Sequence, residues 1–575
     1  MIKNQEYIGE VLSLGSEGEG VINCDGTTAF VPFCLVGERV SFNALKVTGK
    51  VAYGKLTEVH NLSEDRVAPV CPHFEKCGGC TLQHASYPVQ TEFKRQLIVN
   101  CLKKIGGIEF EVNKTVPSPK QYGYRNKLAL PVGVDKDGNT VTGFYAPRSH
   151  RIVPINSCSL QAEWSGTLIS ALTSFMSEAG LKGYDESTRT GEIRHVVVRE
   201  VEGKLIVTVV ATKEVDLTAF ADELDDRLKA YTLWLNINDG VSNVIFSDTW
   251  RLVRGDGYFY GEDEGVKFKA GANTFLQVND GVRKALYRAV TEAVRDDDVV
   301  AVDLYSGGGM LTAMLAKACR AAYGIEVVKE AVACADELKE MNGLTEKMFN
   351  YCGTVEGRIE EVFSKTAGYK RVIVCDPPRK GMERSVVKAI LGSGADKVVL
   401  VSCDPATLAR DLGLLCGTLI ECDGQLKKAD GADKNTAGAQ TGVYEIKSIT
   451  PFDMFPQTKH VETLVVLSKK IPDSHINVEV EFGEGEGQLS LKKIREHAEA
   501  RKPKEKVTYK MIQSYIEKTY GFKVHTAYIA EVKRDLGLPM YDAPNAVEEL
   551  KHPRPHPTPR MVEAIKETLK YFEII

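Results

Sequence analysis

Three features are missing from this chain of 575 residues, and each absence narrows the class of protein. Residues 1–15 lack a charged start followed by an apolar run, so no secretory signal is visible. No stretch approaches the roughly 18 uninterrupted apolar residues of a membrane-spanning helix. Basic residues are not in excess: 73 Lys and Arg stand against 78 Asp and Glu, and the pI is near 6.2. We therefore expect a cytoplasmic protein without membrane contact, in which any nucleic-acid binding is confined to a local basic groove.

The chain contains 14 cysteines. Because no export signal precedes them, we expect them to be reduced, metal-bound or catalytic rather than paired in disulfides. The length predicts several domains rather than one core.

Changes of pattern along the chain predict four parts. Short β-rich runs between glycine turns indicate a small OB-like β-barrel, and a mixed α+β region with a hairpin signal at Asp137-Gly138 follows the cysteine cluster. Buried strands that alternate with helices then predict an α/β, doubly wound, Rossmann-like parallel sheet. The predicted parts are a barrel at 1–59, a cysteine-bearing central domain at 60–270, the α/β domain at 271–470 and a helical C-terminal extension at 471–575.

Two segments have weaker patterns. Residues 423–442 are polar and glycine-rich, which predicts a flexible surface loop. In the extension, Thr508 and Thr526 are predicted to cap two short helices that end at Gly521 and Gly537, and a last helix follows the proline-rich run before residue 560.

The first motif that carries chemistry is Cys71-x5-Cys77-Gly-Gly-Cys80, with Cys158 far downstream. Four thiolates are the usual ligands of an iron–sulfur cluster, and glycines let the backbone fold closely around it. Zinc is the main alternative, although structural zinc sites usually take their ligands in two close pairs.

A second motif, Asp303-Leu-Tyr-Ser-Gly-Gly-Gly309, lies between a predicted strand and a helix. Such a turn allows a ligand to approach the backbone, and Glu326 at the end of the next strand is placed to accept ribose hydroxyls. A dinucleotide enzyme uses the same logic, but GxGxxG is absent. The pattern favours S-adenosylmethionine.

Three further motifs follow predicted strands or precede one. Asp376-Pro-Pro-Arg-Lys-Gly381 is a rigid turn at a strand's carboxyl end, where α/β sheets bind ligands. Cys403 ends another core strand and is aimed at the same crevice, although a lone buried cysteine is more often part of a core. Glu462, after His460, precedes an apolar strand and by default is surface charge.

Together these motifs resemble the bacterial 23S rRNA (uracil-5-)-methyltransferase family over about residues 1–468. GSEGEGV, AFVPFCLVGERV and YGKLTEV resemble its TRAM barrel, an RNA-binding module. CPHFEKCGGCTLQHASY and INSCSLQ resemble its cluster-binding segments. SCDPATLARD and FPQTKHVE are close to its signature text.

The resemblance implies roles for individual residues. It assigns a [4Fe-4S] cluster to Cys71, Cys77, Cys80 and Cys158. It makes Cys403 the nucleophile and Glu462 the base, and it implies S-adenosylmethionine contacts at Gln277, Tyr305, Glu326 and Asp376.

Two positions depart from the family pattern. Asp404 stands where the family usually has asparagine, and its charge is expected to disfavour a thiolate at Cys403. Met310 stands where the glycine turn often carries Asn or Thr, so one ligand contact is expected to differ.

The implied function is methylation of carbon 5 of a uridine in 23S rRNA by a monomer, on a base that is unpaired or flipped out. Arg125 and Lys127 are candidate phosphate contacts, with a solvated loop as the alternative. A tRNA methyltransferase and a cluster-bearing RNA-binding protein without catalysis are the competing hypotheses. The intact Cys403 and Glu462 argue against the second of these.

Overall fold

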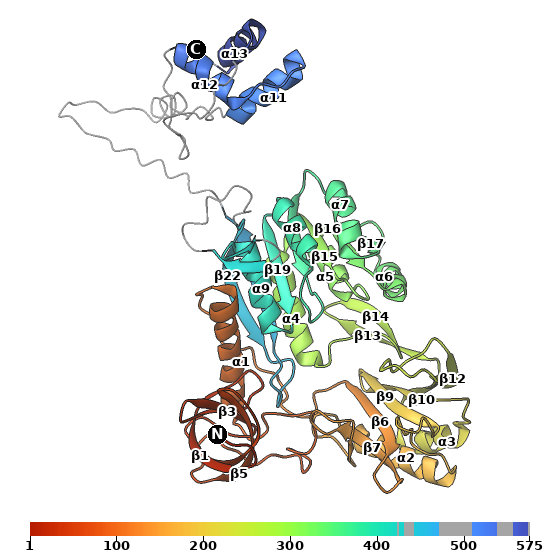
Figure 1. Cartoon of the computed structure of the whole chain (residues 1–575). Helices are drawn as coiled ribbons and strands as arrows, with labels where there is room; N and C mark the ends of the chain where they lie inside the picture. Colours follow the sequence, from red (N-terminus) through yellow and green to blue (C-terminus); the bar gives the residue numbers. More distant parts are fainter. Residues whose placement is uncertain (423–424, 430–441, 471–508, 537–555, 573–575) are drawn as a thin grey trace, which may run out of the picture. The chain divides into compact units, whose positions relative to one another are not determined.

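The computed structural model describes residues 1–422, 425–429, 442–470, 509–536 and 556–572. The chain divides into two compact units, Met1–Pro472 and Asp473–Ile575 (Figure 1). In the part of the chain that the structure describes, no helix is long and apolar enough to cross a membrane.

The first unit begins with a closed five-stranded barrel in the order β1-β2-β3-β5-β4. Alternate residues of its strands point inward, and the core contains Val11, Ile22, Val31 and Phe42. This confirms the predicted small β-barrel. Its strands are β1 (Glu6–Leu14), β2 (Gly20–Cys24), β3 (Thr27–Val31), β4 (Arg39–Thr48) and β5 (Val51–Val59).

A seven-stranded central sheet has the order β12-β11-β10-β9-β6-β7-β8. Helices α2 (Trp164–Glu178) and α3 (Thr218–Arg227) pack on one face. Gly138, with φ +82°, lies in the predicted hairpin turn between β6 and β7. The strands are β6 (Lys127–Val134), β7 (Thr140–Tyr145), β8 (Ile152–Pro154), β9 (Ile193–Val201), β10 (Lys204–Ala211), β11 (Tyr231–Ile237) and β12 (Trp250–Arg254).

The second seven-stranded sheet has the order β17-β16-β15-β18-β19-β23-β22. The first five strands are parallel, as predicted, but β23 is antiparallel to β19 and to β22. A fully parallel sheet was therefore the wrong expectation: β22 and β23 are joined by a short loop rather than a crossover helix. The strands are β15 (Asp296–Leu304), β16 (Cys319–Glu326), β17 (Met348–Cys352), β18 (Lys370–Cys375), β19 (Lys397–Ser402), β22 (Tyr444–Phe452) and β23 (Glu462–Lys469).

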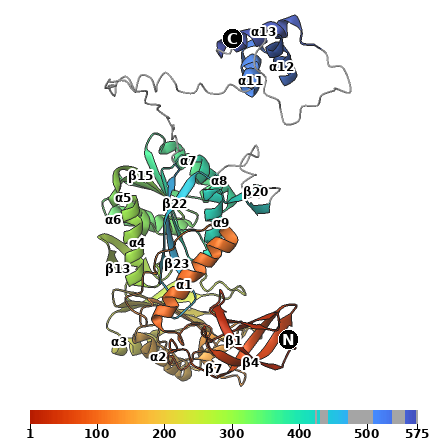
Figure 2. The ribbon, with the colours of Figure 1, turned by 90° about the vertical axis from the view of Figure 1, so that its left-hand side faces the viewer.

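Helices cover both faces of this sheet (Figure 1). One face packs against α4 (Asp280–Val294), α5 (Met310–Ala318) and α6 (Lys329–Met341). The other packs against α7 (Val355–Lys365), α8 (Arg384–Gly392) and α9 (Pro405–Cys416). A helix from the N-terminal half, α1 (Tyr87–Cys101), and the π-helical turn η1 (Leu102–Gly106) lie against α9 (Figure 2).

Two short antiparallel pairs flank the sheets. β13 (Tyr258–Asp263) pairs with β14 (Val266–Gly271), and β20 (Leu419–Cys422) pairs with β21 (Gln425–Lys428). The expectation of one continuous loop at 423–442 is therefore wrong for residues 425–428, which form a strand. The remainder of that stretch, apart from 429 and 442, lies outside the described residues.

In its described residues, the second unit has three helices around a small apolar core: α11 (Tyr509–Tyr520), α12 (Thr526–Asp535) and α13 (Pro559–Tyr571). Gly521 follows α11 with φ +78°, as predicted. Thr526 is not the cap of α12, because His525 takes that position and its Nδ1 accepts a hydrogen bond from the Ala527 N–H at 3.2 Å. Thr508 and Gly537 lie outside the described residues.

Candidate functional site

Strand register brings Cys403 and Glu462 to the same edge of the second sheet. Ser402, the last residue of β19, pairs with Thr463 of β23. Cys403 follows the first of these residues and Glu462 precedes the second, so the antiparallel pairing places the two side chains at neighbouring positions. The carboxyl ends of β15 and β18 lie at this same edge, because those strands are parallel to β19.

The charges at this edge act on one another. Burial, Glu462 and Asp376 raise the pKa of Cys403 to about 11, and the Arg379 guanidinium opposes them. Burial and the Asp376 charge raise the pKa of Glu462 well above its usual range, again against Arg379. Glu462 is 3% exposed, and its Oε2 has no hydrogen-bond partner among the described residues. The site thus places the Cys403 thiol next to a buried carboxyl group, one oxygen of which has no hydrogen-bond partner among the described residues.

Asp404 does not act as the sequence predicted. Its Oδ1 accepts hydrogen bonds from the N–H groups of Ala406 at 3.0 Å and Thr407 at 2.9 Å, which makes it the N-cap of α9. Aspartate is among the preferred residues at this position, because its oxygen satisfies N–H groups that the helix leaves free. Asp404 is not among the groups that shift the pKa of Cys403. Its carboxylate is bonded to the start of α9, and the main causes of the raised pKa of Cys403 lie elsewhere.

The turn that carries Asp376 and Arg379 is held by α9. Thr407 Oγ1 donates to the Arg379 carbonyl at 3.2 Å, and Asp411 Oδ2 accepts from the Met382 N–H at 2.9 Å. Gly381, with φ +75°, has room for no side chain, because a Cβ there would lie 2.4 Å from Arg410 and 2.7 Å from Asp411. These contacts hold the turn of Arg379, to which the sequence analysis assigned no role, within electrostatic reach of the Cys403 thiol.

A cavity of about 330 Å³ lies at the glycine turn after β15. Gly309 adopts φ +81°, and a Cβ there would lie 2.6 Å from Ala335, so only glycine fits. Burial raises the pKa of Asp303 and of Asp376, each to about 7. The lining residues at the turn and the adjacent strand end include Asp303, Tyr305, Ser306, Gly307, Gly308, Met310 and Asp376.

Glu326 and Gln277 lie beside this cavity but are not among its lining residues. The Glu326 carboxylate is engaged with the glycine turn, since Oε2 accepts from the Gly307 N–H at 2.9 Å and Oε1 from the Val328 N–H at 2.8 Å. Gln277 is buried, and its carbonyl accepts a hydrogen bond from Asn126 Nδ2 at 2.9 Å. Tyr305 and Asp376 line the cavity directly, whereas Glu326 and Gln277 bond to residues beside it.

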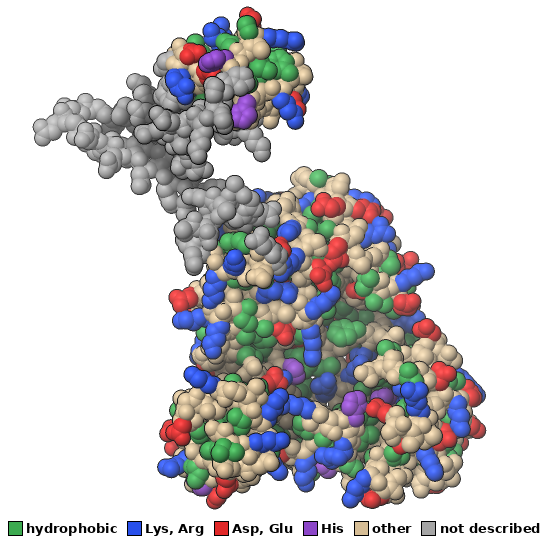
Figure 3. Space-filling view, in the orientation of Figure 1, with side chains coloured by type: hydrophobic (Ala, Val, Ile, Leu, Met, Phe, Trp, Pro, Cys, Tyr) green, Lys and Arg blue, Asp and Glu red, His purple; other side chains and the backbone are tan. Residues whose placement is uncertain are grey.

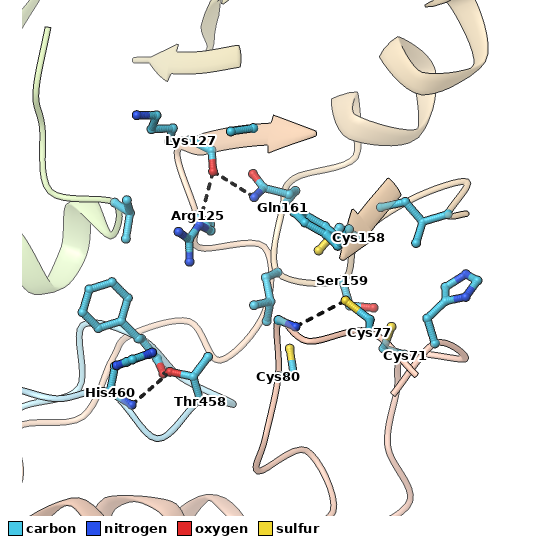
Figure 4. A pocket seen from close by; sticks show the side chains of 18 of the residues that line it. Cys71, Cys77, Cys80, Arg125, Lys127, Cys158, Ser159, Gln161, Thr458 and His460 are labelled. Atoms are coloured by element: carbon cyan, nitrogen blue, oxygen red, sulfur yellow. Dashed lines mark hydrogen bonds between the residues drawn. The ribbon is translucent and has the colours of Figure 1, made fainter. Parts of the chain in front are cut away.

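A second cavity, of about 480 Å³, adjoins the first, because Phe275 and Leu276 line both. Figure 4 shows the four cysteines at one side of it and Arg125, Lys127 and His460 at the other. Gly78 makes this loop possible: its N–H donates to the Tyr145 carbonyl at 3.0 Å, where a Cβ would also lie only 3.0 Å away. The structure therefore gathers Cys71, Cys77, Cys80 and Cys158 around one space.

The loop between β22 and β23, which leads to Glu462, is bonded to the N-terminal parts of the chain. The buried Gln457, with φ +70°, accepts through its carbonyl from the N–H groups of Thr81 at 3.1 Å and Leu82 at 3.0 Å. The Gln90 side-chain amide donates to Gln457 Oε1 at 3.0 Å and accepts from the Gln457 N–H at 2.9 Å. The residue directly after Cys80 is thus bonded to the loop that carries the candidate base.

Comparisons with known proteins relate this chain to a family. The family model of tRNA (uracil-5-)-methyltransferases matches residues 196–420. An uncharacterized RNA methyltransferase of Listeria innocua is 33% identical over 476 residues, 81% of this chain and 98% of that protein. Another from Halalkalibacterium halodurans is 34% identical over 479 residues, with the same coverage. The chain belongs to the RNA (uracil-5-)-methyltransferase family.

A solved structure of a related protein holds the demethylated form of a methyl donor. The tRNA (uracil-54, C5)-methyltransferase of Pyrococcus abyssi, in complex with S-adenosyl-L-homocysteine, is similar with a TM-score of 0.61 and 26% identity. The similarity covers 80% of this chain and 100% of that one. S-adenosylhomocysteine is what S-adenosylmethionine becomes when it has given up its methyl group.

Proposed function

We propose that this methyltransferase methylates carbon 5 of a uridine, with Cys403 as nucleophile and Glu462 as base. The observation that carries the proposal is the β19–β23 register, which places a thiol and a buried carboxyl with an idle oxygen at one sheet edge.

The reaction needs both groups. Carbon 5 of uracil is a poor nucleophile until the Cys403 sulfur adds to carbon 6 and converts the ring to an enolate. Carbon 5 then takes the methyl group, and Glu462 removes the remaining proton from carbon 5 so that the Cys403–carbon 6 bond can break. Arg379 favours the anionic forms of both side chains, since its charge opposes the rise in their pKa.

S-adenosylmethionine supplies an electrophilic methyl group when bound. We assign it to the cavity at the glycine turn, with Tyr305 and Asp376 in its lining and with Glu326 and Gln277 supporting the wall. Met310 adds a thioether to this lining, so the contact made there differs in kind from that of Asn or Thr.

We also propose that the four cysteines hold a [4Fe-4S] cluster, and the residues fit that group. All four ligands are thiols, and burial raises the pKa of Cys80 to about 12, with the other three thiols adding to the rise. Bound metal offsets such a cost, because thiolates are its ligands. Within the described residues, no group of three or more His, Cys, Asp or Glu side chains lies close enough to hold a metal ion.

Protein purified without oxygen is expected to be brown and to contain about four irons and four acid-labile sulfides per chain. Iron, sulfide and zinc are measured together, with Cys158→Ala as the test variant and Cys334→Ala, an exposed thiol outside the cysteine-lined cavity, as its control. Cys158→Ala should lose iron and Cys334→Ala should keep it. Stoichiometric zinc without sulfide would contradict the cluster.

For the substrate we propose 23S rRNA, because the barrel and the cysteine segments resemble those of the bacterial rRNA enzymes. A second candidate is tRNA, favoured by the Pyrococcus neighbour, which aligns over its whole length. Nucleoside mapping of 23S rRNA and tRNA from cells with and without the gene separates the two. Loss of 5-methyluridine from rRNA alone supports the first candidate, and loss from tRNA alone replaces it with the second.

A further inference from the structure

Strands β6 and β9 carry cations on the sheet face that lines the cysteine-bearing cavity. Lys127 of β6 and Arg199 of β9 are direct register partners, so their side chains leave the sheet on the same face. Lys127 and Ala129, two residues further along, line the cavity. The intervening Leu128 and its partner Val198 point the other way, into the core beneath α2 and α3.

Arg199 is buried without the partners that a buried guanidinium needs. It is 3% exposed, and its Nε and Nη1 have no hydrogen-bond partner among the described residues. Neither Arg199 nor Lys127 forms an ion pair with a carboxylate in the described part of the chain, and the Nε of the Arg125 side chain donates to the Lys127 carbonyl at 3.3 Å. An unsatisfied buried cation costs stability, so its presence calls for a reason other than folding.

The acids nearby are committed to another residue. Arg283 of α4 pairs with Asp263 at 2.8 Å and with Asp280 at 2.7 Å, and Asp280 also accepts from Asn126 Nδ2 at 2.7 Å. Glu200, beside Arg199 in sequence, lies on the opposite face and accepts from Trp164 Nε1 at 2.7 Å. Burial, and then the charge of Arg283, lowers the pKa of Arg199 to about 10, with only Asp280 opposing. The pKa of Lys127 is lowered by burial and then by the charges of Arg199 and Arg125.

These neighbours describe a site that lacks an anion. A guanidinium with unpaired donors suits a phosphate oxygen, and an ammonium beside it adds charge. The surface is hollowed between the barrel and the central sheet, and Lys, Arg and His side chains lie in the hollow (Figure 3). We propose that Arg199, Lys127 and Arg125 bind a backbone phosphate of the RNA that flanks the target uridine, an inference that rests on RNA being the substrate.

The test is RNA binding by Arg199→Met in the full-length protein. We measure the Kd for a labelled mixed-sequence RNA oligonucleotide over a series of salt concentrations, together with Tm. Loss of a charged hydrogen bond should weaken binding about tenfold at low salt. The slope of log Kd against log salt should fall by about 0.7, the value for one phosphate contact on a single strand. The Tm should stay level or rise, because the substitution removes an unsatisfied buried charge.

Arg251→Met on the same sheet is the matched control, since Arg251 is exposed and pairs with Glu214; it should leave Kd and slope unchanged. Lys127→Gln, at a half-buried position, should weaken binding like Arg199→Met and keeps the test valid if the latter misfolds. Wild-type protein that does not bind RNA would contradict the proposed function. If the wild-type protein binds RNA but Lys127→Gln and Arg199→Met both keep its Kd and slope, the phosphate site alone is overturned. If Arg199→Met lowers the Tm, unchanged values in Lys127→Gln are enough to overturn it.

Discussion

Glu462→Gln protein is expected to accumulate methylated RNA bonded to Cys403, whereas Cys403→Ala protein is expected to give neither adduct nor product. The asymmetry follows from the order of steps. Sulfur addition and methyl transfer precede proton removal, so a variant without the base stops after methylation. A variant without the thiol never starts. Each is expected to lose turnover by at least about 100-fold, the scale of one acid–base group.

The adduct is measured as a band of RNA-linked protein that survives denaturing electrophoresis, with the methyl group labelled. Glu445→Gln, an exposed carboxylate at the other end of the β22–β23 pair, is the control for Glu462. Cys416→Ala, a half-buried thiol at the end of α9, is the control for Cys403. Both controls should turn over normally. Free turnover by Glu462→Gln would disprove the base, and methylation by Cys403→Ala would disprove the mechanism.

The adduct should also form faster as pH rises. The pKa of Cys403 is about 11, so only a small fraction of the thiol is thiolate at neutral pH. That fraction increases with each unit by which the pH rises toward the pKa. Glu462 is the largest charge that raises this pKa, and the Gln variant removes it. Adduct formation by Glu462→Gln should therefore begin to rise at a lower pH than the single-turnover rate of the wild-type protein does. A rate independent of pH between about 6 and 9 would contradict a protonated resting thiol.

The sequence predicted the separate parts of this site better than their assembly. The strands before Asp303, Asp376 and Cys403 are runs of apolar residues, and the structure has them as β15, β18 and β19. The pairing of Ser402 with Thr463 joins positions far apart in the chain, and no periodicity encodes it. The role of Asp404 was misjudged because its charge is consumed by backbone N–H groups of α9, which become visible only once the helix start is known.

The sequence analysis did not identify Arg199 and Lys94 as important residues, for a related reason. Each lies in an apolar context where a charged residue reads as the end of an element or as solvated surface. Only the folded chain shows that Arg199 forms no ion pair among the described residues and that Lys94 pairs with Asp453. The bonds from Thr81 and Leu82 to Gln457 likewise connect two motifs that the sequence presents as independent.

Lys94→Met is expected to cost about 3–5 kcal/mol of folding stability, because it strands a buried carboxylate. Lys94 and Asp453 are both fully buried and paired; Lys94 Nζ also donates to the Phe455 carbonyl at 3.0 Å, and Tyr87 donates to Asp453 at 2.7 Å. This pair ties α1 to the loop that leads to Glu462, so turnover should fall as well. The measurements are chemical denaturation and kcat.

Two comparisons make the prediction for Lys94 sharp. Lys103→Met removes an exposed partner of Glu109, 3.1 Å away, and should cost no more than about 1 kcal/mol, as surface pairs do. The double variant Lys94→Met/Asp453→Asn should recover part of the loss, since it removes the stranded charge that makes the single variant costly. If Lys94→Met were no less stable than Lys103→Met, the buried pair would not be what holds the loop. If the double variant were as unstable as the sum of its single variants, the two side chains would act independently, and the cost would lie in lost packing instead.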